Sequence, residues 1–287
     1  KALLAFDTYQ ASSFEKNPKA NKLSALLGLF SRNKNYSSFI EQVVSWEMDK
    51  NITSVIHKPT LDSNQSFLYW TKHGVFNFAK TIYLILIEYI ISRVFLDTKT
   101  QPGKHEIICV DNFIIESMLE KGSFSDRYFP ELDIFLSDES DPELFYLPVL
   151  TDFKYPTQFY KAYQLVNRSP QNFLMHEQYL NFFDYLYALF LSVILPLRFK
   201  PIKYFSGFDV TSLVRSELLS DIGSYRLCRA ICRYLFICKL AKKNIKIKTY
   251  LQWTENQDID KAHALAVNHH HPDTNFIGYQ GYFSSQY

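Results

Sequence analysis

The residues most suited to chemistry gather near the C-terminal end of the sequence, just after Leu251. Trp253, Glu255, Asn256 and Gln257 place one aromatic ring, one carboxylate and two amides within five residues. A carboxylate can take up or release a proton, and amides can hydrogen bond to the hydroxyl groups of a ligand. An aromatic ring adds a flat apolar surface on which a ligand can stack. This grouping indicates a binding site that is capable of acid or base chemistry.

The segments around this grouping predict a β-α-β unit. A β-prone run from Ile245 to Leu251 predicts a strand. Thr254 and Gln257 have the spacing of a capping box, which predicts a helix from there to about Asn268. A second short strand is expected at residues 276–277, running into the sequence GYQG.

In such units the two strands are parallel, so functional groups gather beyond their C-terminal ends. Glu255 and Tyr279 are both expected at that edge, with Gln280 beside them. Glu255 also has a purely structural interpretation, because an acidic residue in the first turn of a helix is favoured by the helix dipole alone. Both interpretations stay open at this stage.

Two more carboxylates follow strand-like segments. Asp111 comes directly after the apolar run at 107–110, and Asp209 lies in the sequence GFDVTS at 207–212. Each could bind a ligand at the edge of a sheet, and each could equally cap the next turn or helix. The sequence does not decide between these roles.

Short buried strands alternate with helical segments along the chain, which predicts an α/β fold with a Rossmann-like parallel sheet flanked by helices. A Gly-rich phosphate loop of either common type is absent, so a bound phosphate would be held by helix N-termini and side chains. Arg226, Arg229 and Arg233 form a basic stripe on the helix expected at 224–240, which could meet phosphate or pair with the acidic loop at 137–141.

The composition narrows the class of protein. Of 287 residues 47% are hydrophobic, which is ample for a packed core, and a net charge of +2 is too small to indicate a nucleic-acid partner. The four cysteines contain no CxxC pair, which favours reduced thiols and a reducing, cytoplasmic compartment. No metal site is expected, since the successive side chains of His269–His271 diverge and no acidic partner lies at ligand spacing.

Two apolar stretches, 81–96 and 185–197, are predicted to be buried helices rather than membrane spans. The first carries Glu88 in its middle, and both are shorter than the roughly 20 residues that a span requires. The alternative is a peripheral contact with a membrane, because Arg198, Lys200 and Lys203 follow the second stretch with aromatic residues between them.

Several segments together resemble a family of bacterial proteins of surface-carbohydrate assembly, from capsule and O-antigen gene clusters, with a glycosyltransferase-B-like organisation. The matching segments are YWTK at 69–72, VDNF at 110–113, DRYFPEL at 126–132, YLPVL at 146–150, NFLMHEQYL at 172–180, GFDVTSLVRSELL at 207–219, WTENQDIDKA at 253–262 and HPDTNFIGYQGY at 271–282. The similarity covers roughly residues 69–282. It implies one half of a glycosyltransferase-B fold: a single α/β domain over 1–287 with a helical insertion near 66–96, and a nucleotide-binding half that would follow.

The resemblance also implies a function, which is transfer of a sugar from a nucleotide-activated donor to a glycan or lipid-linked glycan acceptor. Neither a cofactor nor a nucleic acid is expected to take part, and the site would lie in the cytoplasm or against the inner face of the cell membrane. Glu255 would be the acid or base group and Asp209 the second carboxylate. The residues expected to bind substrate are Asp111, Arg127, Trp253, Asn256, Gln257, Lys261, Tyr279 and Gln280.

Within that set the expected roles differ. Asn256, Gln257 and Gln280 suit hydrogen bonds to sugar hydroxyls, Trp253 and Tyr279 suit stacking, and Arg127 and Lys261 suit phosphate. The alternative is a non-catalytic interaction module, which would scaffold a membrane-associated glycan assembly complex through its aromatic helices and the basic segment at 198–203. Convergence of Asp209 and Glu255 on one cleft would favour the enzyme.

Overall fold

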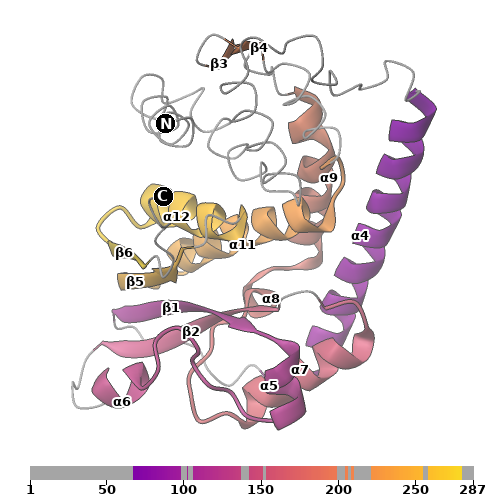
Figure 1. Ribbon diagram of the computed structural model, residues 1–287. Helices are drawn as coiled ribbons and strands as arrows, with labels where there is room; N and C mark the ends of the chain where they lie inside the picture. Colours follow the sequence, from indigo (N-terminus) through magenta and orange to yellow (C-terminus); the bar gives the residue numbers. More distant parts are fainter. Residues whose placement is uncertain are drawn as a thin grey trace, which may run out of the picture. The chain divides into compact units, whose positions relative to one another are not determined.

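The computed structural model describes residues 67–97, 102, 106–136, 142–150, 153–198, 204–205, 208–209, 221–254 and 258–279. Contacts divide the chain into two compact units. One unit comprises the chain up to Thr81 together with Leu189–Cys228, and the other comprises Ile82–Ala188 together with the chain from Arg229 onward. Figure 1 shows the helices and strands of both. The single domain over 1–287 stays a prediction.

The larger unit is built on a four-stranded parallel sheet with the strand order β2-β1-β5-β6 (Figure 1). The strands are β1 (Ile107–Ile114), β2 (Glu143–Leu150), β5 (Ile247–Trp253) and β6 (Asn275–Tyr279). Every residue of β1 is buried, as expected for a central strand covered on both faces. The α/β class and the parallel sheet flanked by helices are therefore confirmed.

The direction in which strands are added reverses between β1 and β5. From β1 the chain adds β2 on one side, returns to place β5 on the other side of β1, and continues to β6. In open parallel sheets, a reversal of this kind leaves a crevice beyond the carboxyl ends of the two strands, where ligands commonly bind. The carboxyl ends of β1 and β5 are therefore the first place to look for a site.

The helices follow from amphipathic segments between the strands. In α7 (Pro156–Arg168), Pro156 occupies the first helical turn, and Phe159, Ala162, Tyr163 and Val166 recur on the buried side. The other helices are α4 (Phe67–Phe95), α5 (Glu116–Lys121), α6 (Leu132–Leu136), α8 (His176–Tyr179), α9 (Phe182–Arg198), α11 (Tyr225–Lys242) and α12 (Asp258–His270). The expected helix near 66–96 is thus a single one, and the main core packs β1 and β2 against α7.

Several predicted boundaries need correction. β1 does not end before Asp111 but continues to Ile114, because Phe113 and Ile114 pair with Val149 and Leu150 of β2. α12 is described over Asp258–His270, and its end lies two residues beyond the predicted one. β2, which contains Pro148, lies at the edge of the sheet, where a missing backbone N–H is tolerated.

The smaller unit contains an antiparallel pair of two-residue strands, β3 (Tyr204–Phe205) and β4 (Phe208–Asp209). Asp209 therefore lies in a hairpin strand, and its side chain is outside the described part of the structure. In the same unit, the Thr81 hydroxyl donates to the carbonyl oxygen of Gly223 (2.7 Å), whose own N–H donates to the Ser192 carbonyl oxygen (3.0 Å). Gly223 has a φ of 63°, which favours glycine.

Both apolar stretches are helical, but the expectation that they are buried is wrong for one side of each helix. Ile90 of α4 and Phe190 of α9 are each 57% exposed. Among the described residues, one helical segment, Gly74–Phe95, is long and apolar enough to cross a membrane by length and composition. This is weak evidence on its own, because core helices of soluble proteins meet the same criterion.

Candidate functional site

A short turn beyond β1 is fixed by one carboxylate. Asp126 Oδ1 accepts hydrogen bonds from the backbone N–H groups of Tyr128 and Phe129, both at 2.9 Å, and from Asn112 Nδ2 of β1 at 2.8 Å. Burial raises the pKa of Asp126, and the three N–H donors act in the opposite direction. The turn at 126–129 is thereby attached to the carboxyl-terminal part of β1.

A second carboxylate joins β1 to β5. The backbone pairing of these strands extends to Val110 and Leu251, and beyond it the Trp253 N–H donates to Asp111 Oδ1 at 2.8 Å. Asp111 is only 1% exposed, and burial raises its pKa well above the usual range, with Asp260 and Asp126 acting in the same direction. Its observed role is thus to bridge the two strands at the switch point, and its predicted contact with substrate stays a prediction.

These two carboxylates position a group of four aromatic rings, Tyr128, Phe129, Trp253 and Tyr279, which we call the aromatic platform. Trp253 lies 4.4 Å from Tyr128 and 5.1 Å from Tyr279 between ring centroids, and Phe129 lies 5.9 Å from Tyr279. Trp253 and Tyr279 are the last residues of β5 and β6 and are paired in register. Tyr279 is 51% exposed, so the platform reaches the surface at the carboxyl edge of the sheet.

The loop after β5 lies close to β6 at the same edge. The Thr254 N–H donates to the Tyr279 carbonyl oxygen at 2.8 Å, and a Cβ atom added at Gly278 would lie 3.0 Å from Thr254 Oγ1. Such a separation is shorter than most Cβ contacts, so a side chain at position 278 would require Thr254 to shift, and glycine allows the close approach. Glu255 is the next residue in the chain after Thr254.

The structure brings some of the predicted site residues together. Trp253 and Tyr279 are in contact, and Arg127 is exposed with its guanidinium carbon 5.9 Å from the centroid of the Tyr128 ring. Lys261 is partly buried in the first turns of α12. The remaining predicted residues whose side chains lie outside the described part are Asp209, Glu255, Asn256, Gln257 and Gln280.

The sequence analysis missed the contribution of Asp126, Tyr128 and Phe129. The available signal was the segment SDRYFPEL, in which an Asp precedes two aromatic residues by two and three positions. An Asp at that spacing commonly accepts hydrogen bonds from the backbone N–H groups of a turn, as Asp126 does here. The contact of Tyr128 in this turn with Trp253, however, depends on the order of the strands in the sheet.

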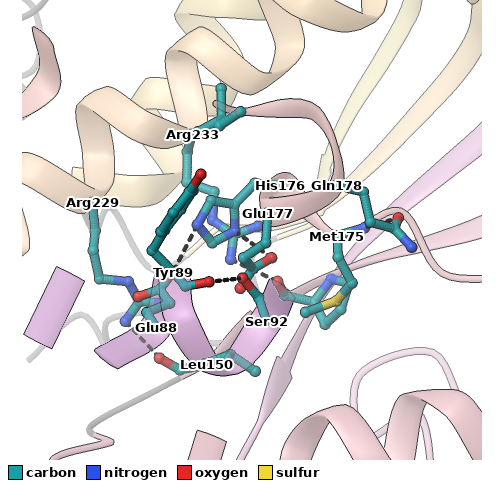
Figure 2. A network of polar contacts seen from close by, with 12 residues as sticks. Glu88, Tyr89, Ser92, Leu150, Met175, His176, Glu177, Gln178, Arg229 and Arg233 are labelled. Atoms are coloured by element: carbon teal, nitrogen blue, oxygen red, sulfur yellow. Dashed lines mark hydrogen bonds and ion pairs between the residues drawn. The ribbon is translucent and has the colours of Figure 1, made fainter. Parts of the chain in front are cut away.

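A second concentration of polar groups lies inside the larger unit and is shown in Figure 2. The imidazole of His176 lies between two carboxylates, with Nε2 2.7 Å from Glu88 Oε1 and Nδ1 3.0 Å from Glu177 Oε2. The Tyr163 hydroxyl donates to Glu177 Oε1 at 2.9 Å. All four side chains are buried. Both ring nitrogens of His176 therefore face carboxylate oxygens.

Two arginines of α11 complete this buried network (Figure 2). Arg233 Nη2 donates to the Pro148 carbonyl oxygen at 2.7 Å, and Arg229 Nη1 donates to the Leu150 carbonyl oxygen. The expectation that these residues form a basic stripe for phosphate is therefore wrong, because both are buried against the end of β2. Burial lowers the pKa of Arg233, and the nearby carboxylates of Glu177 and Glu88 oppose that effect.

Among the described residues, Glu88, His176 and Glu177 are also the group whose ligand atoms lie close enough to hold a metal ion, all within 4.8 Å of one another. The charge balance argues against that role. The two ring nitrogens of His176 already contact the two carboxylates, and the buried guanidinium group of Arg233 also interacts with both, so a dication would have to be added beside an existing buried positive charge. The group formed by Glu88, His176 and Glu177 is best understood as part of a structural ion-pair network.

A further buried group is found in α12, where His263 is fully buried and its ring centroid lies 5.7 Å from that of Tyr250. Burial lowers the pKa of His263 well below its usual range, and the positive charge of Arg233 adds to this effect. The imidazole is therefore neutral at pH 7. All four cysteines are free thiols, as predicted.

Comparison of this chain with family models, with curated proteins and with solved structures found no match. The functional argument therefore rests on the residues and geometry of the chain itself.

Proposed function

We propose that this chain binds a sugar-containing ligand at the carboxyl edge of β1 and β5 and takes part in glycosyl transfer from a nucleotide-activated donor. The observation that carries this proposal is the aromatic platform at the switch point of the sheet. The C–H face of a sugar ring is apolar and stacks on aromatic side chains, while its hydroxyls require hydrogen-bonding groups nearby. Ligands of open parallel sheets collect at this position.

The chemistry is assigned to Glu255, which follows Trp253 by two residues in the chain. The acceptor hydroxyl attacks the anomeric carbon of the donor, and its proton passes to the Glu255 carboxylate. The bond between the anomeric carbon and the phosphate oxygen breaks, and the nucleotide leaves with that electron pair. Asp209, the second proposed carboxylate, keeps only its sequence support, because it belongs to the other unit.

Arg127 is the better supported of the two proposed phosphate ligands. Its side chain is exposed beside the aromatic platform, where a guanidinium group could reach the phosphate of a stacked nucleotide sugar. Lys261, by contrast, is partly buried on α12, whose first turn carries the buried acids Asp258 and Asp260. These two negative charges make the start of that helix unfavourable for phosphate.

The proposal is tested by calorimetric titration of the chain with a panel of nucleotides and nucleotide sugars. The Tyr279→Ala variant should bind the ligand identified about 3- to 10-fold more weakly, which is the usual contribution of one stacked aromatic ring. The matched control is Tyr187→Ala on α9, because Tyr187 has the same exposed fraction of 51%. An equal loss of ligand affinity in both variants would refute the site, because that loss would then not depend on the aromatic platform.

The non-catalytic interaction module is kept as the second candidate, because the exposed apolar side chains on α4 and α9 favour a binding role. The same titration distinguishes the transferase from the interaction module. Binding of one nucleotide class supports the transferase, whereas absence of binding across the panel, both by this chain and by a longer form of the protein, supports the module.

A further inference from the structure

The three successive histidines at the end of α12 do not all point to the same partner. His269 Nδ1 lies 3.4 Å from the hydroxyl oxygen of Tyr234 on α11, and His270 Nε2 lies 3.1 Å from the same oxygen. His271 instead places its Nε2 3.3 Å from the Ile237 carbonyl oxygen. The sequence led us to expect that successive side chains diverge here, whereas the first two converge on one hydroxyl group.

Two helices of the larger unit hold these three side chains, which we call the histidine–tyrosine group (Figure 1). The Tyr234 ring centroid lies 6.4 Å from that of His269 and 5.4 Å from that of His270. Tyr234 and His270 are partly buried, so packing restricts their rings, whereas His269 is exposed and gives solvent access to the group.

The histidine–tyrosine group is separate from the aromatic platform. α12 starts beyond the carboxyl end of β5, and the chain then returns to the start of β6, which is parallel to β5. The last turn of α12 therefore lies toward the opposite edge of the sheet from the platform. An inference about this group does not depend on the proposed transferase function.

The separations within the group fit two edges of a tetrahedral metal site. Zn²⁺ binds imidazole nitrogens at about 2.0–2.1 Å, and at a tetrahedral angle this separates two ligand atoms by about 3.3 Å. The two N···O separations of 3.1 Å and 3.4 Å bracket that value. Imidazole nitrogens are suited to zinc and its neighbours in the first transition row. Three protein ligands would leave the fourth position to water.

The local electrostatics favour a cation. His269 and His270 are the last two residues of α12, where the carbonyl groups of the final turn form the negative end of the helix dipole. Burial raises the pKa of Tyr234, so without an ion its hydroxyl keeps its proton at pH 7. A bound dication acts in the opposite direction and favours the phenolate, and the released proton passes to solvent.

We propose that His269, His270 and Tyr234 bind a divalent transition-metal ion of the zinc type. When the phenol oxygen is counted as a ligand, this is a second place in the described part of the chain where three possible ligand atoms converge. Unlike the buried group around Glu88, it is reached from solvent and lies at the negative end of a helix. The ion connects the end of α12 to α11.

The test is calorimetric titration of the full chain with Zn²⁺ after treatment with a chelator. The chain should bind the ion, and His270→Ala should weaken binding about tenfold or more, because it removes one of three ligands. Tyr234→Phe removes only the oxygen and keeps the ring, so a loss of affinity in this variant reports the third ligand. The matched control is His271→Ala, which removes the neighbouring imidazole and should leave the affinity unchanged. Circular dichroism checks that each variant is folded.

Four outcomes would overturn the proposal. The first is a chain that does not bind Zn²⁺. The second is an equal loss of affinity for His270→Ala and His271→Ala, because the ion would then be held by histidines in general. The third is an unchanged affinity of Tyr234→Phe, which would exclude the three-ligand site. The fourth is binding that persists in His270→Ala and is lost in Glu88→Gln, because the ion would then lie in the buried group around Glu88.

Discussion

Replacement of His176 by leucine should destabilise the fold strongly, because it leaves two buried carboxylates facing an apolar side chain. The imidazole now lies 2.7 Å from Glu88 and 3.0 Å from Glu177, and all three side chains are buried. Removal of one partner from a buried ion pair typically costs about 3–5 kcal/mol of the free energy of unfolding. That is a large part of the roughly 5–15 kcal/mol available to a folded protein.

Urea unfolding of the wild type and the His176→Leu variant at pH 7 measures this loss. A double variant, His176→Leu with Glu88→Gln, should recover much of the loss at pH 7, because it removes one of the uncompensated charges. A loss below about 1 kcal/mol at pH 7 would refute the reasoning, since a buried pair of this kind costs about 3–5 kcal/mol to break.

Three further substitutions have defined outcomes. Glu255→Gln should abolish sugar transfer in a nucleotide-release assay and leave the melting temperature within a few degrees, and normal turnover would exclude Glu255 from the mechanism. Asp111→Asn should be more stable than the wild type, by a margin that grows as the pH rises above about 3.9. The reason is that burial raises the pKa of the Asp111 carboxyl, so its ionisation opposes folding in the wild type. A variant whose free energy of unfolding at pH 8 equals or falls below that of the wild type would contradict this. Gly278→Ala should lower the free energy of unfolding by about 1–3 kcal/mol, because the added Cβ atom would lie 3.0 Å from Thr254 Oγ1. Adding Thr254→Ala should restore that stability in urea unfolding. If it does not, the contact is not the cause of the loss.

The sequence predicted the β-α-β unit at the C-terminal end because its signals are local. The alternation of β-prone and helical segments, with a polar junction after Trp253, is enough to place β5, α12 and β6. The contact of Trp253 with Tyr279 then follows from parallel pairing of neighbouring strands. The strand ending at Val110 was misplaced because Asp111 and Asn112 look like a turn, although both are buried in β1, where Asp111 accepts a hydrogen bond from the Trp253 N–H and Asn112 donates one to Asp126.

Long-range features could not be predicted in this way. The turn at 126–129 and β5 are more than a hundred residues apart, and only the strand order brings Tyr128 to Trp253. The same holds for His176, whose partner Glu88 lies in a helix that the sequence alone showed as an apolar stretch with one acid in it. A lone acid in an apolar helix does signal a buried partner, but the identity of that partner depends on the tertiary fold.

The most direct test of the central claim uses Trp253 as the reporter at the proposed site. The chain has three tryptophans, and the substitutions Trp46→Phe and Trp70→Phe leave Trp253 as the sole one. Titration with the panel of nucleotide sugars should then quench or shift the Trp253 emission, with saturation at the dissociation constant found by calorimetry. A ligand that binds by calorimetry and leaves this emission unchanged would bind elsewhere, and the assignment of the site to the aromatic platform would be wrong.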